Sequence, residues 1–371
     1  MQKRTQIVIA AAIAAIVIGS GIAYAYVVSA PSNPCTPYDS STPSLTVKAP
    51  ALSVDPAHSA AIANSPTARV ASDSLSEAIV PTTATASTKA NPTEVINVVA
   101  AENFWGSLVS QIGGIHTSVT SIVTNPNTDP HEYQANDSDA IAIKDAQYVI
   151  VNNVGYDGWA TSLIASDGDN NQTILNVGDS LGVSVNGGIV TGNPHLWYNP
   201  TYVNETVAWM YHNLTTIAPN LTGYFTDQYN NLTASLASLY SRATQIKELF
   251  AGTEVASTES IFVYLANYTE LDLVSPPAFM EAIAAGNDPS DASVVQFECQ
   301  LESGNIKVLV YNLQTVTPIT TTMKAIAAEH NVTTMFVTET IQPPNVPFQT
   351  WMLGEYDSLE NALNSAALGA G

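Results

Sequence analysis

The chain has 371 residues, enough for two ordinary domains with additional segments. Its apolar content of 46% is ordinary for a globular protein, so a sizeable core is available. Lysine and arginine number only 10 against 32 aspartates and glutamates, and the formal net charge is -22. Such a surface repels nucleic acid and anionic lipid, so neither is expected as a partner. It attracts cations weakly, and it is equally typical of adaptation to acid or salt outside a cell.

Residues 1–30 carry a membrane signal. Lys3 and Arg4 precede an uncharged run over residues 7–28, long enough to cross a hydrocarbon layer of about 30 Å. The positive charges place the start in the cytoplasm and the rest of the chain outside. We expect a retained transmembrane anchor at the outer face of the cell membrane. Cleavage after residues 23–25, Ala-Tyr-Ala, would instead make this segment a signal peptide and release the protein.

Residues 31–92 are rich in Ser, Thr, Ala and Pro and poor in aromatic side chains. Such a segment cannot bury enough apolar surface to fold, so it predicts a disordered tether. The two cysteines, Cys35 and Cys299, are too few to define a disulfide framework or a thiolate metal site. We expect free thiols, and an incidental bridge between them stays open.

Strand-like and helix-like patterns alternate through residues 93–220, which we predict to form an N-terminal α/β lobe. Phe104, Leu108 and Ile112 recur at helical spacing, and two glycines at 113 and 114 end that helix. Strands are predicted at residues 95–101, 118–123 and 148–151, and a further helix at 137–145.

A continuous apolar stripe follows and predicts one helix over residues 222–250. This pattern is also typical of an ordinary core helix, but its position between two α/β segments indicates a linking helix at 221–250. The alternation then resumes in a C-terminal α/β lobe at 251–371. Its predicted strands are 307–311 and 334–337, and its predicted helices are 279–283, 294–301, 318–329 and 348–368.

The predicted fold class is therefore α/β. Two lobes, each with a mainly parallel sheet flanked by helices, are joined by one long linking helix. No internal repeat is visible in the sequence, only a repeat of architecture.

Two histidines occur in matching local sequences. His131 lies in Asp-Pro-His-Glu-Tyr and His195 in Asn-Pro-His-Leu-Trp. The proline before each histidine restricts the backbone, so the imidazole is presented in a defined direction. We interpret this pair as candidate metal ligands. The other four histidines are interpreted as ordinary exposed side chains: His58, His116, His212 and His330.

Two glutamates form a second matched pair, because Glu259 and Glu339 each follow a threonine beside a predicted strand. Taken alone, each would be a surface or capping carboxylate. In open α/β sheets, however, ligands bind beyond the carboxyl ends of the strands. Together with His131 and His195, the glutamates would supply two nitrogen and two oxygen donors, which suit Zn²⁺, Mn²⁺ or Fe²⁺. Zn²⁺ would bind most tightly of these in vitro.

Several motifs together resemble the metal-binding solute-binding proteins of zinc- and manganese-type ABC importers, the TroA/ZnuA type. In the N-terminal half they are Ala-Glu-Asn-Phe-Trp-Gly at 101–106, the two histidine motifs, and Asn-Val-Gly-Tyr-Asp-Gly-Trp at 153–159. In the C-terminal half they are residues 287–289, 310–315, 338–340 and 351–353. The resemblance covers about residues 95–368.

The resemblance implies a fold with two lobes, one long linking helix and a metal ion in the cleft. His131 and His195 match the two histidine ligands of the family's first lobe. Glu259 matches the third ligand, which is His in many zinc-type members and Glu in manganese-type ones, and Tyr264 follows at the expected offset. Glu339 matches the fourth ligand, usually Asp. Some zinc-type members have a loop rich in histidine and acidic residues that scavenges metal. This sequence has no such loop, so metal scavenging by a loop is not expected.

The function implied is capture of a divalent transition metal, Zn²⁺ or Mn²⁺ with Fe²⁺ as a further candidate, and its delivery to an ABC permease. We expect a monomer that is not an enzyme, and a stiff linking helix that allows modest lobe adjustment rather than wide closure. A metal-dependent surface adhesin is the alternative. A metallohydrolase is disfavoured, because it needs an open metal position, and the sequence has no HExxH motif, nucleophile elbow or P-loop.

Overall fold

The computed structural model describes residues 95–368, apart from residues 128, 168–170, 184, 187, 188 and 191. The predicted membrane segment at 1–30 and the predicted tether at 31–92 lie outside the described residues. Within the described part of the chain, no helix is both long and apolar enough to traverse a bilayer.

The N-terminal lobe is built on a four-stranded parallel sheet with the strand order β2-β1-β3-β4. Its strands are β1 (Ile96–Glu102), β2 (Thr117–Val123), β3 (Tyr148–Val151) and β4 (Thr173–Asn176). Its main helices are α2 (Asn103–Gly113), α3 (Asp137–Asp145), α4 (Gly158–Asp167) and α6 (Pro200–Ile217). A short antiparallel pair lies beside the sheet, β5 (Val185–Asn186) with β6 (Ile189–Val190). Parallel strands covered on both faces explain why β3 is buried at every position.

The C-terminal lobe repeats this architecture, with the strand order β10-β9-β7-β8. Its strands are β7 (Glu254–Ser257), β8 (Asp272–Leu273), β9 (Val308–Asn312) and β10 (Thr333–Val337). Its helices are α8 (Val263–Tyr268), α9 (Pro277–Ala284), α10 (Asp291–Glu302) and α11 (Pro318–Glu329). In both lobes the first strand lies between the second and the third, and the fourth is at the far edge beside the third. The expected repeat of architecture is confirmed.

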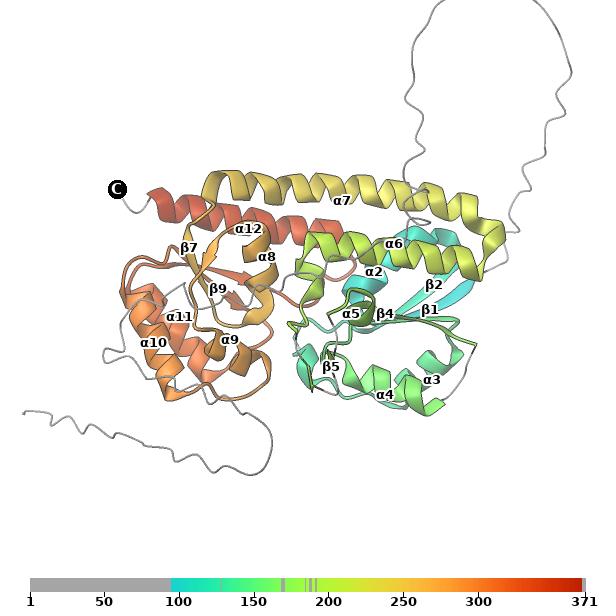
Figure 1. The fold of residues 1–371 in the computed structure, drawn as a ribbon, viewed down its shortest axis with the longest axis horizontal. Coiled ribbons are helices and arrows are strands. Elements are labelled where there is room, and N and C mark those ends of the chain that lie inside the picture. Colours follow the sequence, from blue (N-terminus) through green and yellow to red (C-terminus); the bar gives the residue numbers. More distant parts are fainter. Residues whose placement is uncertain are drawn as a thin grey trace, which may run out of the picture.

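Two long helices run along one side of both lobes (Figure 1). Helix α7 (Thr222–Phe250) contacts α2 and α6 of the first lobe, and it also contacts α12 (Phe348–Leu368). Arg242 of α7 forms ion pairs of 2.9 Å with Asp357 and 2.6 Å with Glu360 of α12. The predicted linking helix is confirmed, and α12 packs alongside it against both lobes.

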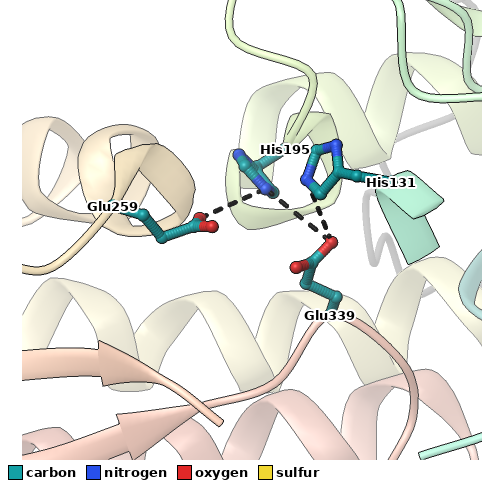
Figure 2. Close-up of side chains that lie close together, drawn as sticks. All are labelled: His131, His195, Glu259 and Glu339. Atoms are coloured by element: carbon teal, nitrogen blue, oxygen red, sulfur yellow. Dashed lines mark ion pairs between the residues drawn. The ribbon is translucent and has the colours of Figure 1, made fainter. Parts of the chain in front are cut away.

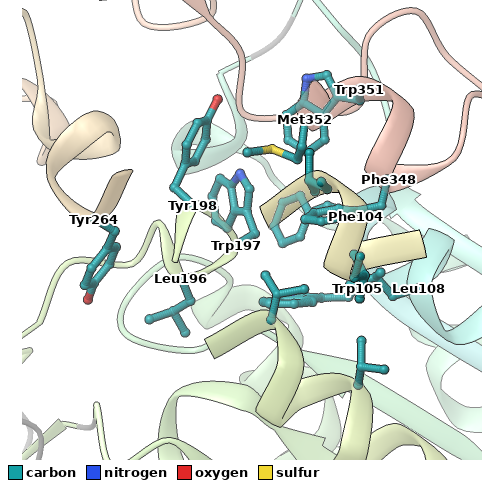
Figure 3. Packing of buried hydrophobic residues seen from close by; sticks show 14 of the residues in the cluster. Phe104, Trp105, Leu108, Leu196, Trp197, Tyr198, Tyr264, Phe348, Trp351 and Met352 are labelled. Atoms are coloured by element: carbon teal, nitrogen blue, oxygen red, sulfur yellow. The ribbon is translucent and has the colours of Figure 1, made fainter. Parts of the chain in front are cut away.

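One apolar core extends through both lobes and the two long helices. Its aromatic part lies where the lobes meet (Figure 3): Phe104 of α2 stacks on Trp197 with ring centroids 3.9 Å apart. Tyr198 then meets Trp351 of α12 edge to face, with centroids 6.3 Å apart. Rigid rings packed in this way hold the segment that contains His195 in a defined position. Smaller apolar clusters fill the outer faces of the two sheets.

Most predicted elements agree with the structure to within a few residues, and the long helix at 222–250, the closing helix at 348–368 and the helix at 137–145 have the predicted bounds. The 18-residue helix α6 and the short strands β4 and β8 were not predicted. The expectation of free thiols was wrong for Cys299 of α10, because this cysteine is disulfide-bonded. Composition alone could not show this, because pairing depends on which side chains the fold brings together.

Candidate metal centre

The four side chains that the sequence analysis gives as candidate metal ligands converge between the two lobes. His131 lies in the short 3₁₀ turn Pro130–Glu132 after β2, and His195 directly precedes the turn Leu196–Tyr198. Glu259 and Glu339 each stand two residues beyond a strand, β7 and β10 respectively. One donor atom from each of the four side chains lies within 4.8 Å of the others (Figure 2). The first lobe thus contributes both imidazoles and the second lobe both carboxylates.

The two histidines lie in turns with the same hydrogen-bonding pattern. The Asp129 side chain accepts a hydrogen bond of 2.9 Å from the backbone N–H of His131. The Asn193 side chain accepts one of 3.0 Å from the backbone N–H of His195. In each case an Asx side chain caps a turn that the following proline has already bent. The matching Asx-Pro-His sequences therefore reflect a matching structure.

Asn193 also determines which nitrogen of His195 is available. Its side-chain oxygen lies 2.7 Å from Nδ1 of His195, so Nδ1 carries the proton and donates. Burial, followed by the charge of His131, holds the pKa of His195 well below its usual value. Nε2 is therefore the unprotonated nitrogen, which is the form that coordinates a metal ion.

The distances between the imidazole Nε2 atoms and the carboxylate oxygens match those between donors around one ion. Nε2 of His131 lies 3.4 Å from Oε2 of Glu339. Nε2 of His195 lies 3.4 Å from Oε1 of Glu259 and 3.9 Å from Oε2 of Glu339. Donors at about 2.0 Å from a tetrahedral ion would be about 3.3 Å apart. Both Nε2 atoms are buried and make no hydrogen bond, which is the condition expected of atoms that ligate an ion.

Without a cation between them, two ionised carboxylates buried this close together would destabilise the folded protein. Glu259 and Glu339 are both fully buried. Burial, and next the nearby charge of Glu339, raise the pKa of Glu259 well above its usual value. A divalent cation between the carboxylates would offset both effects, because it favours the charged form of each. The donor set therefore fits a divalent transition metal.

The loop that contains Glu339 is held from several sides. The Gln314 side-chain oxygen accepts backbone hydrogen bonds of 2.9 Å from Glu339 and 3.0 Å from Thr340. Thr338 donates to Glu355 through its N–H at 3.2 Å and its hydroxyl at 3.1 Å. The ligand carboxylate is thus placed by a rigid hydrogen-bonded frame.

Tyr156 and Asn312 are two of the residues that contact the glutamates and were not predicted as site residues. Tyr156 donates a hydrogen bond of 2.7 Å to Oε2 of Glu339. Asn312 donates to both glutamates. Both lie within segments that carry the family resemblance, and Asn312 is a polar residue at the end of a buried strand. That last signal could have identified it.

The turn that carries Tyr156 is strained. Asn153 and Val154 both have positive φ angles, 62° and 55°, and a β-branched residue rarely adopts this conformation. The Asp157 carboxylate stabilises the turn by accepting backbone hydrogen bonds of 2.6 Å from Asn152 and 2.7 Å from Asn153. Strain maintained in this way occurs at functional sites, where it positions a particular side chain. Here that side chain is Tyr156.

Of the remaining histidines, His212 and His330 are exposed as expected. His116 is not exposed: only 3% of its surface is accessible, and its ring packs against Tyr224 with centroids 4.8 Å apart. His116 is the last residue of the short turn before β2, and it packs against α7 there. Its neighbours in the sequence did not indicate this burial. His58 lies outside the described residues.

Two α/β lobes with donors from both at their junction define the architecture of a two-lobed solute-binding protein. The family model for the periplasmic component A of zinc-uptake complexes, ZnuA, matches residues 98–362, and the chain belongs to this family. Matched structures include a ZnuA crystal structure at 18% identity and a TM-score of 0.60, covering 72% of this chain and 99% of that one. The zinc-binding protein TroA of Treponema pallidum matches at 13% identity and 0.61, again covering 72% and 99%. The FpvC protein of Pseudomonas aeruginosa in complex with Mn²⁺ matches at 18% and 0.59, covering 73% and 99%.

Proposed function

We propose that this protein captures one divalent transition-metal ion, Zn²⁺ or Mn²⁺, between its lobes and delivers it to an ABC permease in the cell membrane. The observation that carries the proposal is the convergence of His131, His195, Glu259 and Glu339 from two lobes, with both imidazole Nε2 atoms buried and without hydrogen bonds. Membership of the zinc-uptake family supports the transport role.

Capture proceeds from the side of His131. This imidazole is 16% exposed, while the side chains of His195 and both glutamates are fully buried. An arriving ion therefore meets His131 first and exchanges its water for protein donors as it moves inward. Because Glu259 has a raised pKa, binding releases a proton from any fraction of this carboxyl that is protonated. Affinity is accordingly expected to fall as the pH decreases.

Metal stoichiometry tests the site. The purified full-length protein is stripped with a chelator, reloaded with Zn²⁺ or Mn²⁺, dialysed and measured by elemental analysis. We expect about one ion per chain, and none above background when His131→Ala and His195→Ala are combined. The matched control combines His212→Ala and His330→Ala, two exposed histidines away from the site, and should bind like the parent. An unchanged stoichiometry in the His131/His195 variant would refute the site.

The transport role requires a separate measurement, because binding does not show delivery. Host cells that lack the gene should take up less radiolabelled metal at low external concentration, and the parent gene but not the His131/His195 variant should restore uptake. The structure also resembles the laminin-binding protein Lmb of Streptococcus agalactiae, described as having adhesin and metal-transporting activity, at 17% identity and a TM-score of 0.61. Normal uptake combined with lost surface adhesion in the deletion strain would favour the adhesin alternative.

A further inference from the structure

We infer that Asn312 acts as a clamp on the two ligand carboxylates, so that each offers a single oxygen to the ion, and that the site thereby selects Zn²⁺ over Mn²⁺. Asn312 is then a positioning residue that determines specificity without touching the metal. The inference rests on the proposed function, since it takes Glu259 and Glu339 as ligands.

The sheet topology explains why one side chain reaches both carboxylates. Strand β9 lies between β7 and β10, and Asn312 is its last residue, opposite Val337 of β10. Glu259 and Glu339 each follow the end of a neighbouring strand by two residues. Adjacent strands are about 4.8 Å apart, so the carboxyl end of the middle strand is within hydrogen-bonding range of loops on both sides.

The amide group of Asn312 contacts both glutamates with its donor side. Nδ2 lies 2.6 Å from Oε1 of Glu339 and 3.2 Å from Oε2 of Glu259. Its side-chain oxygen accepts a hydrogen bond of 2.9 Å from the backbone N–H of Gln314. This second bond determines the orientation of the amide, because a flipped group would place an oxygen against two carboxylates and lose the bond to Gln314.

The clamp divides each carboxylate into an outer and an inner oxygen. The outer oxygens, Oε2 of Glu259 and Oε1 of Glu339, are the ones bound by Asn312, and the hydroxyl of Thr315 adds a contact of 3.1 Å to the latter. The inner oxygens, Oε1 of Glu259 and Oε2 of Glu339, are the ones that face the imidazole Nε2 atoms. Each inner oxygen also accepts one hydrogen bond, from the Ile261 N–H at 2.8 Å and from the Tyr156 hydroxyl at 2.7 Å. Bidentate coordination by either glutamate would therefore have to compete with the bond that holds its outer oxygen on Asn312.

Two nitrogens and two single oxygens make four donors. Zn²⁺ is well satisfied by four ligands in a tetrahedron, whereas Mn²⁺ is typically bound by six donors, mainly oxygens. Bidentate carboxylates are the means by which a site with two glutamates could supply more oxygens from the protein alone. Because three of the four ligand side chains are fully buried, water can add to the ion only past His131. The clamp thus penalises Mn²⁺ more than Zn²⁺.

Co²⁺ is a direct probe of this inference, because its visible absorption is intense in a tetrahedral site and weak in a six-coordinate one. The chelator-stripped full-length protein should give the intense tetrahedral spectrum with one equivalent of Co²⁺. In Asn312→Ala the absorption should weaken. The ratio of Mn²⁺ to Zn²⁺ dissociation constants, from competition titrations, should fall by about tenfold or more. Asn305→Ala, at an exposed asparagine just before β9, should leave both quantities unchanged.

The outcomes separate the inference from the function on which it rests. A parent protein that binds metal but gives the weak six-coordinate Co²⁺ spectrum overturns the clamp and leaves metal capture intact. Unchanged spectra and metal preference in a folded Asn312→Ala variant also overturn it. If that variant does not fold, the Co²⁺ spectrum of the parent protein still decides. A parent protein that binds neither Co²⁺ nor Zn²⁺ refutes the proposed function itself.

Discussion

Tyr156 of the N-terminal lobe donates a hydrogen bond of 2.7 Å to Glu339 of the C-terminal lobe. The lobes are also connected by the Tyr198 hydroxyl, which donates at 2.8 Å to the backbone oxygen of Thr338, and by Asn193, which donates at 2.6 Å to the backbone oxygen of Ser260. These bonds surround the four converging side chains, and the helix pair α7 and α12 joins the lobes on one side. We therefore retain the expectation that ion binding needs modest adjustments rather than wide closure.

Tyr156→Phe should weaken Zn²⁺ binding by about tenfold, because second-layer hydrogen bonds orient metal ligands and their loss typically costs that much affinity. The phenol is buried, and its hydroxyl lies 2.7 Å from Oε2 of Glu339, the oxygen that faces His131 and His195. Isothermal titration with Zn²⁺ measures the change. Tyr211→Phe is the control, because its hydroxyl bonds to Thr226 between α6 and α7 and should leave affinity at the parent value. Equal affinities for the two variants would show that Tyr156 does not position Glu339.

Glu355 should make the metal-free protein less stable as the pH rises from about 4.5 to about 8. Burial raises the pKa of this carboxyl to about 8, although Thr338 and Trp351 donate to it. In this window the folded state keeps a proton that the unfolded state has lost, so the free energy of unfolding falls with increasing pH. The contribution is absent below about pH 4.5 and complete above about pH 8.

The substitution Glu355→Gln keeps the shape and the accepting oxygen but cannot ionise. The free energy of unfolding is measured by urea titration at pH 5 and at pH 8, with chelator present. Between these two pH values it should fall more in the parent than in the variant, by an amount on the order of a few kcal/mol. Glu329→Gln, at an exposed position, should follow the parent. The same pH dependence in all three proteins would contradict an ionisable role for Glu355.

Cys299 should carry no free thiol in the native protein, because it is disulfide-bonded. The only other cysteine in the sequence is Cys35, which therefore is the expected partner within one chain. Alkylation of the unfolded, unreduced protein should label neither cysteine, and proteolysis should release one peptide pair that a reductant separates. Two alkylated cysteines, or a dimer linked through Cys299, would contradict this pairing.

Local sequence was sufficient to predict most of the fold. The apolar spacing of α7, the two glycines at the end of α2 and the buried strand β3 are each recognisable from neighbouring residues in the chain. Helix α6 was missed because its residues mix threonine, asparagine and aromatic side chains, so its stripe is weaker. Strand β8 has only two residues and no periodicity to detect.

His131 and His195 were recognisable because the Asx-Pro-His turn is a local device, encoded in consecutive residues. Glu259 and Glu339 were predicted mainly through family resemblance, since nothing near them in the chain distinguishes them from capping carboxylates. Sequence therefore determined the layout of two similar α/β lobes and the candidate donor types. Only the tertiary structure decided that Asn312, on the strand between β7 and β10, contacts both carboxylates, and that Tyr156 crosses from the other lobe. Contacts of this kind depend on strand order and lobe packing, which join residues far apart in the chain and leave no local pattern.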